Sequence, residues 1–243
     1  MESAPPRAGL AGQCLCVGQV AQPDSGRFLT RRIASLVCHG LPSVEDCWGR
    51  ALWGLGAAVS GHGAPREHDS ALTAFERGAD WRSPHPRAMA FAALGAAEIL
   101  DILPDHCGAR DLIAAAAQMI GDPECADGWL WPEPRLTYAN AVLPEVLVAA
   151  GTVLDEPELV ERGLRLLGWL LDVQTRAAHP SVVPVRGRGR PGPVPGFDQQ
   201  PVEVPALAAA RGPASPVPAA HRCARGGQGH GWLPVPPAGS KVR

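Results

Sequence analysis

Hydrophobic residues recur at helical spacing through the middle of the chain, in two kinds of stretch. The nearly apolar stretches lie at 46–59, 86–100 and 140–151, and the amphipathic stretches lie at 69–80, 106–120 and 156–173. A helix that is apolar on every side needs neighbours on every side, whereas an amphipathic helix leaves one face in water. The two kinds alternate along the chain. The pattern therefore predicts an all-α domain in which inner and outer helices alternate.

The spacing of the apolar stretches suggests how these helices are arranged. They begin near 46, 86 and 140, and a further start lies near 199, which suits repeated helical hairpins. Small residues such as Gly49, Gly56 and Gly95 would let the inner helices approach closely. Two concentric layers of such hairpins form an α/α toroid, and this is the predicted fold. A helical solenoid is the main alternative, and it would show a tighter period than the sequence does.

Composition divides the chain into three segments. Residues 1–43 are weakly patterned, and residues 44–210 form the predicted toroid domain. Residues 211–243 are rich in Pro and Gly and nearly devoid of large aliphatic side chains. Such a tail cannot bury enough apolar surface to offset the entropy of ordering it, so we expect it to be disordered.

Charge and cysteine usage exclude several classes of partner. A formal net charge of -2 gives no electrostatic reason to expect nucleic acid or an anionic membrane. The sequence has no apolar run long enough to span a bilayer, and its seven cysteines form no CxxC pair. These features suit reduced thiols in a cytoplasmic protein. One adjacent pair, Cys38 and His39, cannot complete a tetrahedral zinc site, so no metal is expected. No phosphate-binding loop points to a cofactor.

Polar and aromatic residues collect at the predicted starts of the inner helices. Antiparallel hairpins return the chain to the same rim, so these starts should converge around one funnel. Tryptophan and tyrosine rings stack on sugars, and amide, carboxylate and guanidinium groups match paired hydroxyls. The candidate catalytic residues are Glu45, Asp46, Glu133, Asp198 and Glu203. The candidate sugar-binding residues are Trp48, Arg50, His85, Arg87, Trp131, Arg135, Tyr138, Asn140, Gln199 and Gln200.

Several of these residues have a simpler structural interpretation. Asp46 and Asp198 are suitable helix N-caps. Trp48 and Trp53 have the spacing of core residues, and Glu203 fits an ordinary helix surface.

Five motifs carry a resemblance to a known family. They read "SVEDCWGRALWGLG", "RSPHPRAMAFAALGAAEIL", "WPEPRLTYANAVLPEVL", "LRLLGWLLDVQT" and "FDQQPVEV". Over about residues 43–207 the chain resembles bacterial proteins of the six-hairpin glycosidase-like class, whose members are often labelled glycosyltransferase because related domains accompany such enzymes. The resemblance implies an α/α toroid associated with carbohydrate, with a glycosyltransferase as a candidate partner. It supplies no assigned catalytic residue to transfer to this chain.

The two ends depart from that family. Its members have an earlier hairpin and further hairpins after the last motif. Here the first 40 residues do not match, and after Ala206 the chain turns to Arg, Gly, Pro and Ala. That composition is typical of a high-GC gene read in a shifted frame. We therefore expect an incomplete toroid with one or both ends frameshifted.

Two classes of function follow from the sequence. The first is a carbohydrate-active or glycosyltransferase-associated domain that binds or processes a sugar in the funnel. The second is a non-catalytic helical scaffold that binds a protein or a glycan. Two carboxylates facing each other across about 5 to 10 Å would favour an enzyme.

Overall fold

The described part of the chain covers most of the predicted helical domain. The structure is a computed structural model, and it describes residues 25–28, 31–32, 38–39, 42–61, 64–122, 128–176, 179–189, 198 and 203–204. The predicted disordered tail at 211–243 and the candidate sugar contacts Gln199 and Gln200 lie outside the described residues.

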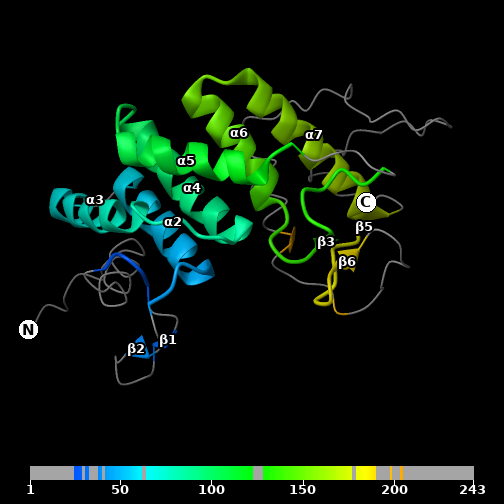
Figure 1. The fold of residues 1–243 in the computed structure, drawn as a ribbon, viewed down its shortest axis with the longest axis horizontal. Helices are drawn as coiled ribbons and strands as arrows, with labels where there is room; N and C mark the ends of the chain where they lie inside the picture. The colour runs from blue at the N-terminus through cyan, green and yellow to red at the C-terminus, as the bar shows by residue number, and fades with distance from the viewer. Residues whose placement is uncertain are drawn as a thin grey trace, which may run out of the picture.

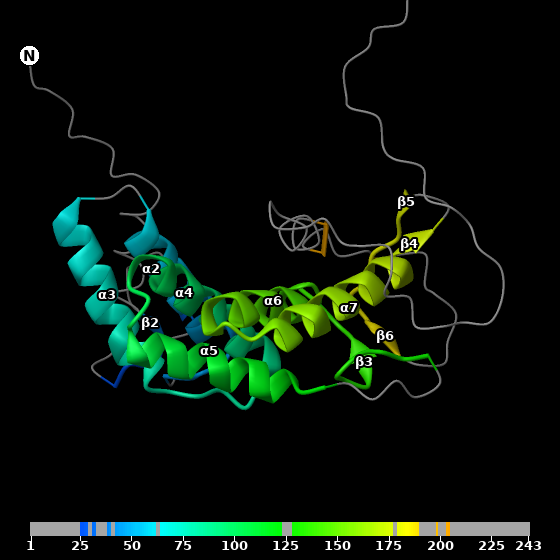
Figure 2. The same ribbon diagram turned by 90° about the horizontal axis from the view of Figure 1, so that it is seen from above.

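Within these residues, six helices form three consecutive hairpins. They are α2 (Asp46–Ser60) with α3 (Pro65–Ala79), α4 (Pro86–Ile102) with α5 (Cys107–Ile120), and α6 (Val142–Leu154) with α7 (Pro157–Val173). The six predicted helices are confirmed. The largest shift is at α3, which begins at Pro65 instead of at 69. The hairpins lie side by side along the molecule, from α2 and α3 at one end to α6 and α7 at the other (Figures 1 and 2).

Local sequence signals explain where several helices begin and end. Pro65, Pro86 and Pro157 open α3, α4 and α7. Proline suits this position because its fixed φ is helical and a missing N–H costs nothing there. The ring of His106 accepts a hydrogen bond from Ala109 N at the start of α5. At the end of α6, Asp155 adopts a left-handed conformation, with φ of 59°, that stops the helix.

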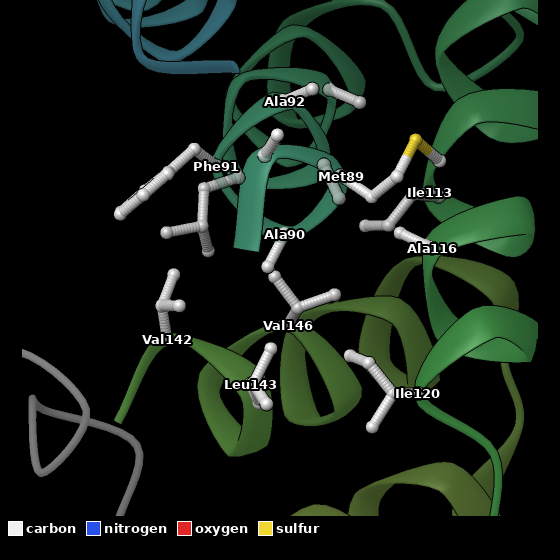
Figure 3. Packing of buried hydrophobic residues seen from close by; sticks show 14 of the residues in the cluster. Met89, Ala90, Phe91, Ala92, Ile113, Ala116, Ile120, Val142, Leu143 and Val146 are labelled. Atoms are coloured by element: carbon white, nitrogen blue, oxygen red, sulfur yellow. The ribbon is translucent and has the colours of Figure 1, made fainter. Parts of the chain in front are cut away.

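Helix α4 occupies the centre of the array. It packs against α2, α5 and α6, and 12 of its 17 residues are buried. Figure 3 shows Met89 of α4 directed toward Ile113 of α5, with Leu143 and Val146 of α6 beneath. This placement explains why the sequence of α4 is apolar on nearly every side, since it has neighbours on nearly every side.

Glycines set the close approach of α2 and α4. A Cβ atom added to Gly49 would lie 2.2 Å from the backbone oxygen of Ala88, and one added to Gly56 would lie 2.3 Å from that of Gly95. Both contacts join residues 39 positions apart, so the two helices run parallel. Of the glycines in these helices, Gly54 makes no such contact. The predicted role of small residues between inner helices holds for the other positions.

Short strands outside the helices were not predicted. They are β1 (Arg31–Arg32), β2 (Cys38–His39), β3 (Arg135–Leu136), β4 (Thr175–Arg176), β5 (His179–Pro180) and β6 (Arg188–Gly189). They pair antiparallel as β1 with β2, β3 with β6, and β4 with β5. The β3–β6 pair ties the loop before α6 to the segment after α7. Across the described ranges, no helix is both long and apolar enough to cross a membrane.

Candidate functional site

The starts of α2, α4 and α6 meet at one end of the array, which we call the rim. Arg87, the second residue of α4, reaches the loop before α6, where its Nε donates to the carbonyl of Tyr138. The hydroxyl of Tyr138 in turn donates to Asp46, the first residue of α2, over 2.8 Å. Three segments separated by up to 92 residues are therefore joined by side-chain bonds. Three of the four predicted starts therefore lie together, and the fourth, near 199, lies outside the described residues.

Arg87 organises the buried part of the rim. Arg87 is 6% exposed, and its Nη1 donates to both carboxylate oxygens of Glu133, over 2.6 and 2.8 Å. Its Nη2 donates to Asn140 Oδ1 over 2.9 Å. Nη1 alone thus bridges both oxygens of the carboxylate, while Nε and Nη2 bond to other groups, so every nitrogen of the guanidinium has a charge-assisted partner. Arg87 also lies over the ring of Tyr138, with its Cζ 5.2 Å from the ring centroid.

Tryptophans hold Glu133 in place. Trp131 Nε1 donates to the carboxylate of Glu133 over 3.2 Å, and Trp129 Nε1 donates to its backbone carbonyl over 2.9 Å. Both indoles are buried against Trp169 of α7, Trp129 edge-on and Trp131 stacked. The crowded "WLWPEP" stretch is therefore an aromatic cluster that positions a carboxylate. Trp131, a predicted sugar contact, is 3% exposed and has this supporting role.

Asn140 links Arg87 to the C-terminal side of the domain. Its Oδ1 also accepts from Thr137 N, and its Nδ2 donates to Glu203 Oε2 over 2.8 Å. The same oxygen of Glu203 accepts from Gln174 Nε2 over 3.2 Å, at the end of α7. These bonds fix the orientation of both amides. We call Arg87, Glu133, Asn140, Gln174 and Glu203 the inner cluster.

The inner cluster retains two buried acceptors. Glu203 Oε1 and Gln174 Oε1 have no hydrogen-bond partner among the described residues, and both residues are at most 1% exposed. Buried acceptors of this kind are commonly met by ordered water. Because Glu203 is enclosed, it fits neither the predicted helix-surface role nor direct contact with a ligand in this conformation.

A second, open group of residues lies on α2 beside the inner cluster. Asp46, Arg50 and Trp53 are spaced at i, i+4 and i+7, which places them on one helix face. Side chains of Asp46 and Arg50 are 34% and 45% exposed, and Arg50 Nε lies 3.8 Å from Asp46 Oδ2. Trp53 is partly buried and stacks on Phe91 of α4. We call Asp46, Arg50 and Trp53 the α2 strip.

Two groups near the rim have raised pKa values. Burial and the hydrogen bond to Asp46 raise the pKa of Tyr138 to about 12, so its hydroxyl is a donor at neutral pH. Burial also raises the pKa of Glu145, in the first turn of α6, to about 7. The carboxylate of Asp46 therefore accepts a hydrogen bond from a neutral phenol on one side and lies beside the Arg50 guanidinium on the other.

Several candidates from the sequence have other roles. Trp48 is fully buried and donates to the carbonyl of Gly78, so it is a core residue and cannot serve as a sugar platform in this conformation. Glu45 is the N-cap of α2 without a side-chain cap bond, so the cap interpretation does not hold for Asp46. The exposed His85 is the N-cap of α4, and Arg135 donates to the carbonyl of Arg186.

Asp198 is the remaining described candidate. It is exposed, with φ of 59°, and its carbonyl accepts a hydrogen bond from Val185 N over 2.9 Å. Its side chain forms no hydrogen bond or ion pair with the described residues, so it stays outside the inner cluster. Among the residues with assigned positions, no group of three or more His, Cys, Asp or Glu side chains could hold a metal ion.

Sequence reasoning missed Gln174, whereas its core interpretation of Trp53 holds in part, since this residue is half-buried and packs against the core. Gln174 comes at the end of an amphipathic helix, where nothing in the local pattern marks a buried amide. Trp53 shares the i, i+4, i+7 face of Asp46 and Arg50, and this periodicity was the available signal.

No protein-family model, curated protein or solved structure matches the chain.

Proposed function

We propose that this chain is a carbohydrate-binding domain whose hairpins form part of an α/α toroid, with the sugar site at the rim. The observation that carries the proposal is the chain of contacts from Asp46 through Tyr138 to Arg87. It brings a carboxylate, a guanidinium and a phenol ring from three helix starts to one place. Such a mixture suits a ligand with apolar ring faces and many hydroxyls.

The arrangement of helices supports the toroid. Helix α2 runs parallel to α4, and both are bonded at the rim to the loop that leads into α6, as expected for inner helices. Helices α3, α5 and α7 return the chain after each of them, as expected for an outer layer. The resemblance to domains that accompany glycosyltransferases supports a role in holding a glycan for such an enzyme.

The rim suits binding better than cleavage. Glycosidic hydrolysis uses two carboxyl groups that flank the scissile bond. Here both oxygens of Glu133 are engaged by Arg87, and Glu203 is buried behind Asn140. This leaves Asp46 as the accessible member of the three candidates joined at the rim. The other exposed carboxylate at the rim, Glu45, directly precedes Asp46 at the same helix start, and this pair beside Arg50 favours recognition of hydroxyls.

The test uses the full chain on a glycan array, followed by isothermal titration calorimetry with each sugar that binds. We expect binding by the wild-type protein and a loss of about tenfold or more for Asp46→Asn, because one charge-assisted hydrogen bond is weakened. Asp111→Asn is the matched control, since Asp111 is exposed in the first half of α5. This helix begins where α4 ends, on the side of the array away from the rim. Absence of binding to every sugar would overturn the proposal, and so would equal losses in the two variants.

A further inference from the structure

The α2 strip offers an elongated, partly open surface beside the rim. From Asp46 to Trp53 the helix rises by about 10 Å, which is roughly the length of two linked sugar rings. The polar end holds Asp46 and Arg50, and the aromatic end holds Trp53. A ligand lying along the helix would therefore meet a hydrogen-bonding end and a stacking end.

Phe91 holds the strip in place from below. Phe91 is 2% exposed, and Figure 3 shows its side chain leaving α4 on the side away from Met89 and Ile113. Trp53 stacks on it with the ring centroids 5.9 Å apart, and the Arg50 guanidinium lies 4.0 Å from its centroid. These contacts restrict both side chains before a ligand arrives, which lowers the entropy lost on binding.

The charges of the rim favour a neutral ligand. Arg50 lies beside Asp46, and the guanidinium of Arg87 is buried against Glu133. A phosphate or carboxylate on the ligand would approach two open carboxylates, Asp46 and the exposed Glu45, with Arg50 as the nearby exposed cation of the strip, so repulsion offsets the attraction. Hydroxyls can donate to Asp46 and accept from Arg50 without this penalty.

Resting on the proposed function, we propose that the α2 strip binds a neutral oligosaccharide, with one ring stacked on Trp53 and the next hydrogen-bonded to Asp46 and Arg50. The ligand class is thereby a neutral glycan at least two rings long. Nucleotide sugars and uronic acids are disfavoured, so the strip would hold an acceptor or a product glycan instead of an activated sugar donor.

The experiment measures dissociation constants of the full chain by calorimetry and saturation-transfer NMR. The neutral probes are glucose, galactose, mannose, maltose, cellobiose, lactose and mannobiose, and the anionic probes are glucuronic acid and UDP-glucose. We expect a neutral disaccharide to bind more tightly than its monosaccharide and than either anionic probe.

Trp53→Ala should weaken the binding of that disaccharide about tenfold, the scale of one lost aromatic contact, and Trp53→Phe should restore part of the affinity. Trp81→Ala is the control, because that indole is exposed and bonds to Ser25 instead.

The outcomes separate this inference from the proposed function. If no probe and no glycan on the array binds, the proposed function fails and the inference fails with it. If sugars bind but UDP-glucose or glucuronic acid binds most tightly, the domain is a sugar binder and the neutral-ligand inference is wrong. The inference is also wrong if Trp53→Ala binds as well as the Trp81→Ala control while circular dichroism shows both variants folded.

Discussion

The inner cluster and the α2 strip contain the same kinds of residue in opposite environments. In the inner cluster, the guanidinium of Arg87 is enclosed with Glu133 and Asn140, and each partner is fixed by further bonds. In the α2 strip, Asp46 and Arg50 lie 3.8 Å apart and both remain accessible to water. A buried pair is expensive to disrupt, whereas an exposed pair contributes little to stability and can exchange its partner for a ligand. Position, more than residue type, thus separates the buried inner cluster from the surface proposed for recognition.

Replacing one arginine from each region gives the largest expected difference. Arg87→Met removes the cation that faces Glu133 and Asn140, and a broken buried ion pair costs about 3 to 5 kcal/mol. Arg50→Met removes an exposed pair and should cost under about 1 kcal/mol. Urea unfolding followed by tryptophan fluorescence would measure both free energies of unfolding.

A companion variant keeps that comparison interpretable. Arg87→Lys retains a charge for Glu133 but has a single nitrogen, so it cannot also bond to Tyr138 and Asn140, and its stability should fall between those of the wild type and Arg87→Met. Similar losses for Arg87→Met and Arg50→Met would mean that the inner cluster is no more structural than the α2 strip.

The second prediction uses the pKa of Glu145, a carboxyl in the first turn of α6. Its pKa is about 7 in the folded protein and 4.5 in an unfolded chain, so the folded state binds more protons between these values. The free energy of unfolding should therefore fall as pH rises from 4.5 to about 7. At about 1.4 kcal/mol per pKa unit, the loss above pH 7 is at most on the order of 3 kcal/mol.

Glu145→Gln should abolish this loss, because the amide stays neutral. The variant should melt at a higher temperature than the wild type at pH 8 and near the same temperature at pH 5. Glu158→Gln is the matched control, as Glu158 is exposed in the first turn of α7 and should change neither value. A Glu145→Gln gain that is equal at both pH values would rule out titration as its cause.

The helices were predictable from sequence, and particular residues show why. Proline at the starts of α3, α4 and α7 and the all-round apolar pattern of α4 are local signals that survive in the fold. The glycine contacts at Gly49, Gly56 and Gly95 also follow from composition once α2 and α4 are paired. The two-residue strands were not predictable, because their pairing depends on where distant loops come together.

The position of the candidate site was more predictable than the burial of its residues. Starts of successive hairpins had to share one rim, and this placed Asp46, Arg87, Tyr138 and Asn140 together. Burial decided what each residue does there, and burial depends on packing that the sequence does not display. Trp48 therefore proved to be a core residue, while Trp53, five positions along the same helix, lies on the open face.

The last prediction concerns Tyr138, which joins the two regions with one residue. Its carbonyl accepts from Arg87 of the inner cluster, and its hydroxyl donates to Asp46 of the α2 strip. Tyr138 is also the single tyrosine of the chain, so the alkaline change in near-ultraviolet absorbance reports this phenol alone.

We expect the pKa of Tyr138 to be about 12, with burial as the main cause and Asp46 as the second. Because this value lies above the ordinary 10.0, the phenol stabilises the fold below pH 10 and the contribution is lost as pH rises toward 12. Asp46→Asn should lower the pKa without returning it to 10.0, since burial remains. Tyr138→Phe should cost only about 1 kcal/mol, because Asp46 can bond to water instead. A phenol that titrates near 10.0 in the folded wild type would show that Tyr138 is open to solvent and does not link the two regions.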